Sequence, residues 1–278
     1  MKPAGEEEVR GAVVAVDIGG TKMAAAIVDA DGQLHARRQV PTPPTADPEE
    51  VFSSLAAMVG EVMDDAASRA GPTGRIPTAG RGVGAPRSGG VGRRGPTGRI
   101  PTGRIIACGV GCGGPMTPGG TAVSPLHIPA WRRFPLPARM EALLGLPTFC
   151  DNDAKALTLG EGWVGAAAGE SCYVGMVVST GVGGGIVLDG RLLEGGSGNA
   201  GHIGHMVVEP DGRPCACGGR GCLEAEASGR AIEAMTGRPA AQATPEVVAR
   251  TGRLVGRALA SVANLCDLRL AVVGGSVA

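Results

Sequence analysis

One order of predicted elements, strand–strand–strand–helix–strand, occurs twice along this chain and limits its fold more than any other feature. The first copy combines apolar, β-branched runs with a helix that opens at Asp47-Pro48, and its strands are 12–18, 22–29, 33–40 and 105–110. The second copy has strands at 172–179, 186–189, 191–193 and 270–273, with helices at 223–235 and 245–266. We therefore expect an α/β protein of two domains with a cleft between them, rather than one doubly wound sheet.

The two copies meet where a predicted strand, 146–150, runs into Asp151-Asn152-Asp153 and a helix over 154–165. We place an N-terminal α/β domain over 1–150 and a C-terminal α/β domain over 151–278. Residues 71–104 interrupt the first domain, because the octapeptide Gly-Pro-Thr-Gly-Arg-Ile-Pro-Thr stands at 71–78 and again at 95–102. The segment is rich in Gly, Pro and Arg and holds no acid, so we predict a disordered insertion.

Composition excludes several classes of function. The chain has 278 residues, 43% of them hydrophobic, which is enough for two packed cores. Its 26 basic and 26 acidic residues balance, so nothing draws the whole chain to nucleic acid or to an anionic membrane. The basic insertion could touch RNA or DNA, but a solvated loop is the simpler interpretation. No apolar run reaches the length of a membrane span, and residues 1–10 do not resemble a signal peptide, so we predict a cytoplasmic protein with reduced thiols.

Three cysteines and an upstream histidine predict a metal centre. Cys215, Cys217 and Cys222 lie within eight residues, separated by glycines and one arginine, and His205 stands ten residues before them. Disulfides or buried free thiols are the alternative, but Cys215 and Cys217 are too close in sequence to pair easily. Cys₃His is a standard structural set for Zn²⁺, and four protein ligands leave no position for a reacting water. We therefore predict structural zinc bound by His205, Cys215, Cys217 and Cys222.

Two glycine-rich turns occupy matching places in the two copies. The first is Asp17-Ile18-Gly19-Gly20-Thr21-Lys22, where backbone N–H groups, Thr21 and Lys22 could meet phosphate oxygens and Asp17 could hold Mg²⁺. The second is Ser179 to Gly185, with Thr180, Gly181 and Gly183 as candidate contacts. A Gly-Gly turn alone is often only a hairpin. Two of them suggest a clamp around one polyphosphate, and the last predicted strand ends in a further pair, Gly274-Gly275.

Polar residues of the C-terminal half complete the candidate site. In Asp151-Asn152-Asp153, Asp151 or Asn152 could simply cap the following helix. A carboxylate at a strand end could also serve as a general base, and Asn152 can donate to and accept from sugar hydroxyls. His202 could be a buried core histidine or a ligand contact. Glu224 could favour a helix N-terminus or bind a pair of adjacent hydroxyls.

Together these motifs resemble the ROK family (repressor, open reading frame, kinase) of sugar kinases and regulators. The resemblance covers nearly the whole chain except 71–104, and its most specific element is Cys215-x-Cys217-Gly-x-x-Gly-Cys222-x-Glu224 with Ala227-Ser228-Gly229. It implies an actin-like ATPase fold of two ribonuclease-H-like domains, ATP with Mg²⁺, and a homodimer in many members. It also implies that Asp153 is the catalytic base toward the 6-hydroxyl of a hexose. Asn152, His202, His205 and Glu224 match sugar-binding positions.

Departures from the family pattern affect the choice of sugar. Glucose-type members have Glu where this chain has His202, a version that resembles bacterial N-acetylmannosamine kinases. Ser124 to His127 stands where many members have Asn, and the family continues past Ser276 with helices, so we expect the chain to be truncated. We predict an ATP-dependent hexose kinase, with an N-acetylhexosamine kinase of the same family as the alternative. A sugar-responsive regulator would need a DNA-binding module before the first strand, and an inactive remnant is the third reading.

Overall fold

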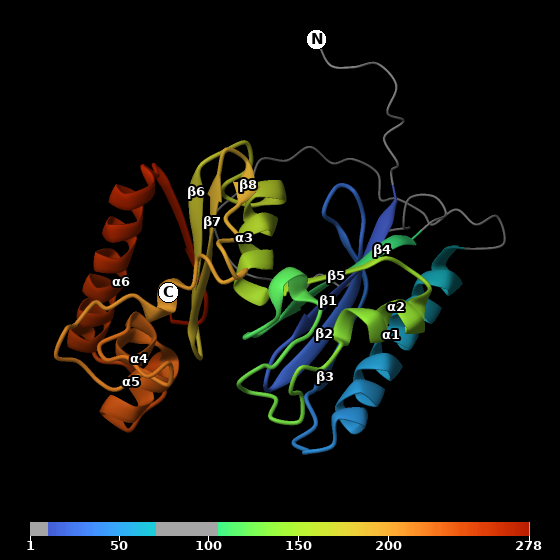
Figure 1. Cartoon of the computed structure of the whole chain (residues 1–278), viewed down its shortest axis with the longest axis horizontal. Coiled ribbons are helices and arrows are strands. Elements are labelled where there is room, and N and C mark those ends of the chain that lie inside the picture. The colour runs from blue at the N-terminus through green and yellow to red at the C-terminus, as the bar shows by residue number, and fades with distance from the viewer. Residues whose placement is uncertain (1–10, 71–104, 278) are drawn as a thin grey trace, which may run out of the picture. The chain divides into compact units, whose positions relative to one another are not determined.

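The structure is a computed structural model that describes residues 11–70 and 105–277 (Figure 1). The chain divides after Cys150 into two compact units, Met1–Cys150 (unit 1) and Asp151–Ala278 (unit 2), which we describe one at a time. The predicted disordered insertion at 71–104 lies outside the described residues. Within the described parts of the chain, none of the helices combines the length and apolar character that a bilayer span needs.

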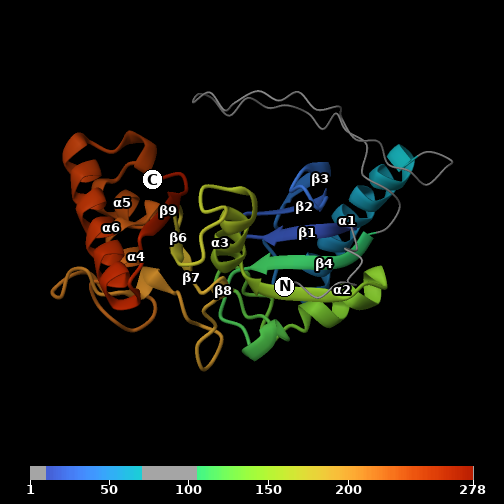
Figure 2. The same ribbon diagram turned by 90° about the horizontal axis from the view of Figure 1, so that it is seen from above.

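Unit 1 is built on a five-stranded sheet in the order β3-β2-β1-β4-β5. The strands are β1 (Ala12–Ile18), β2 (Lys22–Val28), β3 (Leu34–Pro41), β4 (Ile105–Cys112) and β5 (Thr148–Asn152). β1 pairs with β2 antiparallel and with β4 parallel. Figure 2 shows β3, β2, β1 and β4 following one another in this order. The helices are α1 (Pro48–Ala70), α2 (Leu136–Leu144) and the short η1 (Pro118–Gly120).

The core of unit 1 follows from the period of two residues in its strands and of about 3.6 residues in its helix α1. Alternate residues of β1 are buried, and the apolar face of α1 packs on β2 and β3. Val51, Leu55 and Val59 of that face are fully buried. Trp131 is also buried, lies parallel to Phe134 with ring centroids 4.7 Å apart, and donates to the Pro48 carbonyl oxygen at 3.2 Å.

Unit 2 is a four-stranded sheet in the order β8-β7-β6-β9, with helices on both faces. Its strands are β6 (Tyr173–Val178), β7 (Val182–Leu188), β8 (Arg191–Leu192) and β9 (Leu270–Gly274). Its helices are α3 (Asp153–Val164), η2 (Ile203–His205), α4 (Leu223–Ala227), α5 (Gly229–Thr236), η3 (Ala240–Gln242) and α6 (Pro245–Cys266). Figure 1 shows α3 and α6 on opposite sides of this sheet. Val174, Met176 and Val178 of β6 share one buried cluster with α6.

The predicted duplication is visible in the topology of the two sheets. In unit 1 the order β3-β2-β1-β4 has antiparallel pairs except β1–β4, and in unit 2 the order β8-β7-β6-β9 has antiparallel pairs except β6–β9. An α/β protein was therefore predicted correctly from the repeated order of elements, and the structure adds that both sheets are mixed.

Two local predictions were wrong, and one helix was missed. Helix α2 was not expected at all. The helix expected over 223–235 is two helices, because Ser228 ends α4 and then caps α5 by accepting a hydrogen bond from the Ala231 amide at 3.1 Å. The second glycine loop is shorter than expected, since β7 already begins at Val182 and contains Gly183 to Gly185.

Candidate active site and metal centre

The N-terminus of α3 carries the predicted catalytic base, Asp153, and a predicted sugar contact, Asn152. Asn152 is the N-cap, and its Oδ1 accepts from the amides of Ala154 at 3.0 Å and Lys155 at 3.3 Å. The cap uses the acceptor of the Asn152 amide, which leaves its donor Nδ2 for a ligand. Asp153 is the first residue of the helix, its side chain is exposed, and its Oδ1 accepts from the Ala154 amide at 2.9 Å. Its carboxylate is therefore oriented by the helix end and open to a substrate.

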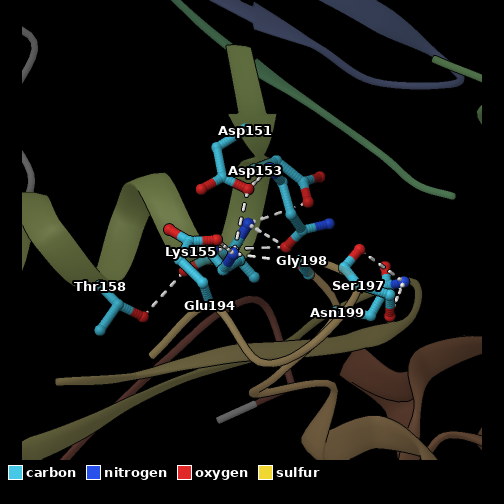
Figure 3. A network of polar contacts seen from close by, with 10 residues as sticks. Asp151, Asp153, Lys155, Thr158, Glu194, Ser197, Gly198 and Asn199 are labelled. Atoms are coloured by element: carbon cyan, nitrogen blue, oxygen red, sulfur yellow. Dashed lines mark hydrogen bonds and ion pairs between the residues drawn. The ribbon is translucent and has the colours of Figure 1, made fainter. Parts of the chain in front are cut away.

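A buried lysine stands next to this carboxylate. The Lys155 side chain has no exposed surface, and its Nζ lies 2.7 Å from Glu194 Oε2 and 3.3 Å from Asp151 Oδ1 (Figure 3). Asp151 Oδ1 also accepts from the Asn152 amide at 2.7 Å. Neither Lys155 nor Glu194 was predicted as a site residue. The signal available in the sequence was a lysine on the first turn of a helix whose other inward residues are small.

His202 lies between these groups and the cysteine loop. Its ring is half-buried, and its centroid lies 6.4 Å from that of His205. Burial lowers the pKa of His202, the charges of His205 and Lys155 lower it further, and the carboxylates of Asp151 and Asp153 act in the opposite direction. The net shift is downward, so the imidazole is neutral at pH 7 and offers one donor and one acceptor.

The four predicted metal ligands form one cluster. The ligand atoms of His205, Cys215, Cys217 and Cys222 all lie within 4.8 Å of one another. The Nδ1 of His205 is 3.6 Å from Cys215 Sγ, and Cys217 Sγ is 3.7 Å from Cys222 Sγ. A disulfide would need sulfur atoms about 2.05 Å apart. Around a tetrahedral Zn²⁺ with bonds of about 2.3 Å to sulfur and 2.05 Å to nitrogen, neighbouring ligand atoms lie about 3.6–3.8 Å apart. The donor set and its spacing therefore fit zinc.

The cysteine loop is held in shape by backbone bonds. The Cys215 amide donates to the Gly219 carbonyl at 2.8 Å, and the Gly221 amide donates to the Arg213 carbonyl at 2.8 Å. Gly221 has a φ of +68°, and a Cβ there would lie 1.6 Å from the Glu209 carbonyl oxygen. Only glycine fits this position, which stands directly before the ligand Cys222.

Crowding of the thiols favours a bound cation. Burial, together with hydrogen bonds and charge from the neighbouring Cys217 and Cys215, raises the pKa of the Cys222 thiol to about 12. Several thiolates this close together repel one another unless a cation lies between them. The chemistry of the cluster thus agrees with its spacing.

Glu224 connects the cysteine loop to the turn after β6. Cys222 is the N-cap of α4, which places Glu224 in the first turn of that helix. Its Oε2 accepts from the Val182 amide at 2.9 Å, and a Cβ on Gly181 would lie 2.7 Å from the same oxygen. One carboxylate oxygen of Glu224 is thus committed to the backbone, which leaves the other for a ligand.

The turn after β6 is built from several backbone contacts. The Ser179 carbonyl accepts from the Gly229 amide at 2.7 Å, and Ser179 Oγ lies 3.0 Å from Ser276 Oγ. Gly275, after Gly274 at the end of β9, has a φ of +118° and lies so close to the Val178 carbonyl that a Cβ would be 2.1 Å from its oxygen. Thr180 remains exposed. Thr180 and Gly181 are therefore the parts of this turn that a ligand can reach.

Glycines within β7 have a packing role. A Cβ on Gly183 would lie 2.6 Å from Ala154 Cβ, and one on Gly185 would lie 2.8 Å from Thr158 Oγ1. Helix α3 rests directly on this strand, so close approach of helix and sheet explains these glycines. The predicted loop over Ser179 to Gly185 is shorter in the structure because β7 begins at Val182, and the phosphate contact of Gly183 stays a prediction.

The first glycine turn lies in unit 1, between β1 and β2. The Gly19 amide donates to the Lys22 carbonyl at 3.0 Å, and Thr42 Oγ1 donates to the Gly19 carbonyl at 2.7 Å. A Cβ on Gly20 would lie 2.3 Å from His127 Cβ, so close packing also explains this glycine. Among the predicted phosphate contacts, Asp17, Gly20, Thr21 and Lys22 are exposed. The structure thus brings the catalytic, sugar and metal candidates together in unit 2 and keeps the Asp17–Lys22 turn as a separate feature of unit 1.

Comparison with known proteins assigns most of the chain to the family whose motifs it resembles. The model of the ROK family matches residues 13–77 and 100–278. An N-acetylmannosamine kinase of Escherichia fergusonii is 34% identical over 279 residues, covering 95% of this chain and 82% of that protein. The ROK hexokinase of Thermus thermophilus superimposes with a TM-score of 0.73 at 33% identity, covering 96% of this chain and 82% of that one. A ROK family glucokinase from Streptomyces griseus, solved with glucose and AMPPNP, gives 0.71 at 29%, covering 96% and 84%. The chain therefore belongs to the ROK family.

Proposed function

We propose that the protein is an ATP-dependent kinase that phosphorylates the 6-hydroxyl of a hexose or N-acetylhexosamine. The observation that carries the proposal is the position of Asp153, an exposed carboxylate at the start of α3 whose Oδ1 accepts from the Ala154 amide at 2.9 Å, next to the helix cap Asn152. The kinases among its relatives support the same class of reaction. We also propose that the two units form an actin-like ATPase fold and that the protein works in the cytoplasm as a homodimer.

Asp153 would act as the general base. Phosphoryl transfer needs the attacking hydroxyl held in line with the γ-phosphate and its proton accepted as the bond forms. The Ala154 amide at the N-terminus of α3 donates to Asp153 Oδ1 at 2.9 Å and so fixes the direction of this carboxylate. Exposure of the side chain lets the sugar hydroxyl approach within hydrogen-bond distance.

The sugar would be held by groups that the fold leaves unused. Asn152 keeps its donor Nδ2, because its oxygen caps α3. His205 turns Nδ1 toward Cys215, which leaves Nε2 for a hydroxyl, and Glu224 keeps one carboxylate oxygen. His202 adds a neutral imidazole. Each of these groups offers a hydrogen bond with fixed direction, as discrimination among sugar hydroxyls requires.

Zinc would be held by His205, Cys215, Cys217 and Cys222 and would supply rigidity rather than chemistry. Four protein ligands fill a tetrahedral shell, so the ion would orient His205 and the helix α4 that carries Glu224. In unit 1, Gly19, Gly20, Thr21 and Lys22 are proposed to contact ATP phosphates and Asp17 to hold Mg²⁺. In unit 2, the same role is proposed for Thr180, Gly181, Gly274 and Gly275. Gly183 keeps its packing role within β7.

N-acetylmannosamine is the first sugar to test. The relatives at 34% identity include several N-acetylmannosamine kinases, whereas the glucokinase from Streptomyces griseus is 29% identical. The presence of His202, where glucose-type members carry Glu, favours the same choice. Glucose, mannose and N-acetylglucosamine complete the comparison.

The test is an ADP-release assay on the wild-type chain and on Asp153→Asn. The amide keeps the size of the carboxylate but accepts no proton at neutral pH, so we expect kcat to fall about 10²–10⁴-fold while the sugar still binds. Asp189→Asn is the matched control, because Asp189 is an exposed acid of the same unit in a turn with φ of +50°, which Asn tolerates. Normal turnover by Asp153→Asn would remove the proposed base.

A further inference from the structure

Lys155 makes a complete set of ionic contacts in the interior of unit 2. Its ammonium has three N–H donors, and three oxygens surround it: Glu194 Oε2 at 2.7 Å, the Gly198 carbonyl at 3.1 Å and Asp151 Oδ1 at 3.3 Å (Figure 3). The lysine side chain has no exposed surface, whereas the side chains of Glu194 and Asp151 are 59% and 33% exposed. Burial of an ammonium costs several kcal/mol unless such partners compensate, so this arrangement needs a reason beyond packing.

The partners of Lys155 belong to a segment with little structure of its own. Residues 193–202, here called the glycine-rich segment, run from the end of β8 to η2 without helix or strand. The segment contains four glycines, and Gly195, Gly198 and Gly201 have positive φ. Glycine gives a chain the greatest freedom when unfolded, so such a segment needs tertiary contacts to keep one conformation. Lys155 binds it at two points, a side chain and a carbonyl.

The contacts of Lys155 connect the proposed catalytic base to a proposed sugar-binding residue. Lys155 is two residues after Asp153 on the first turn of α3, and the glycine-rich segment ends at His202. Lys155 Nζ donates to the Gly198 carbonyl at 3.1 Å, four residues before His202, and the charges of Lys155, Asp151 and Asp153 are close enough to affect the pKa of the His202 ring. A change in the Lys155 contacts would therefore move His202 relative to Asp153.

We propose that Lys155 is a positioning residue that fastens the glycine-rich segment to the first turn of α3 and thereby sets the distance between His202 and Asp153 when a sugar binds. This inference rests on the proposed function for its substrate, a hexose or N-acetylhexosamine. Lys155 does not touch the reacting atoms. It acts through Glu194 and Gly198, and the pair Lys155–Glu194 determines how tightly the sugar is held.

The test compares Lys155→Met, Glu194→Gln and the control Glu209→Gln. Met keeps the length of the lysine chain and removes the charge, and its burial is tolerated because Glu194 can turn to water. Gln at 194 retains an oxygen that accepts from Nζ, so its effect is smaller in the same direction. Glu209 is an acid of the same unit, 44% exposed, that pairs with Arg257 at 3.3 Å away from the glycine-rich segment.

We expect Lys155→Met to raise the KM for the sugar about tenfold, since a displaced binding group weakens the productive geometry. The KM for ATP is expected to stay within about twofold, because the turn after β6 in unit 2 is held by Glu224 and Gly229 rather than by Lys155. Amide hydrogen exchange of residues 195–201 speeds up, while that of β6 keeps its wild-type rate. Glu209→Gln changes none of these values.

Two results overturn the inference. The first is an unchanged sugar KM and unchanged exchange of 195–201 in both Lys155→Met and Glu194→Gln. The second is an equal rise of both KM values together with a lower unfolding midpoint, which marks a merely structural pair. If Lys155→Met does not fold, Glu194→Gln decides by the same criteria. If the wild-type chain turned over none of the sugars, the proposed function would be wrong. Amide hydrogen exchange of residues 195–201 would still decide whether Lys155 holds the glycine-rich segment in place.

Discussion

The glycines of the cysteine loop offer a matched pair of substitutions with different predicted costs. Gly218 and Gly221 both have positive φ, +91° and +68°. A Cβ on Gly218 would meet nothing within 4 Å, whereas one on Gly221 would lie 1.6 Å from the Glu209 carbonyl oxygen. Both replacements by Ala lower the free energy of unfolding, because alanine is strained in the left-handed conformation. Only Gly221→Ala adds a steric overlap with backbone atoms, which cannot rotate away as a side chain could.

The magnitudes follow from these two terms. An L-residue in the left-handed region costs about 1–2 kcal/mol, which is the whole expected effect of Gly218→Ala. Overlap in a well-packed region adds about 1–3 kcal/mol, so Gly221→Ala is expected to lose about 2–5 kcal/mol in total. The Gly221 amide and carbonyl also bond to Arg213 and Val208, both at 2.8 Å, and a shift of residue 221 would strain both bonds.

Urea unfolding followed by circular dichroism measures the difference, and metal analysis of the same samples reports on the ligand cluster. Gly221→Ala should lower the free energy of unfolding more than Gly218→Ala and should also weaken metal retention, because residue 221 immediately precedes Cys222. Equal losses for the two variants would refute the reasoning, since the backbone term alone would then explain both.

Two further predictions concern the same unit. Elemental analysis is expected to find about one zinc ion per chain. Cys222→Ala should reduce this zinc content, whereas Cys172→Ala, which lies outside the cluster, should leave it unchanged. Removal of the metal by a chelator should weaken sugar binding and thermal stability together, and a metal-free chain with full sugar affinity would contradict this. Burial acts to raise the pKa of Glu226, but the Arg213 amide at 2.6 Å and the Arg250 guanidinium outweigh it and hold the pKa below 4.5. A depressed folded-state pKa gives stability that is present above pH 4.5 and is lost as pH falls through the folded pKa. The difference in unfolding free energy between wild type and Glu226→Gln should therefore shrink below about pH 4.5. A difference that stays constant with pH would exclude this linkage.

The strands and long helices could be predicted because their signals are local. Pro48 and Pro245 stand at the first positions of α1 and α6, and the apolar runs of β1 and β2 alternate or continue as buried strands require. Helix α2 was missed because its N-cap is Pro135, a residue that usually marks a turn, while its clearer end signal is Gly145 in the left-handed conformation.

Other features depend on tertiary contacts that no local pattern contains. Gly183 and Gly185 look like a phosphate loop in sequence, and only the approach of Ala154 and Thr158 on α3 shows that they are strand glycines. Lys155 has an ordinary helix sequence around it, and its role depends on Glu194, 39 residues away. That His205, Cys215, Cys217 and Cys222 form one cluster could be predicted, because zinc chemistry restricts residue type and spacing together.

The cysteine loop and the turn after β6 are coupled through a short path within unit 2. Cys222 caps α4, the fully buried Leu223 anchors that helix in the core, and Glu224 reaches from it to the Val182 amide. Each connection in this path is a single residue or a single hydrogen bond. A displacement of the cysteine cluster would therefore be transmitted directly to Gly181. A change at Cys222 should therefore alter the turn after β6, which we propose contacts phosphate, as well as the proposed sugar contacts. This coupling gives a physical reason why the proposed metal ion, which would perform no chemistry, is useful in the same unit as the proposed catalytic base.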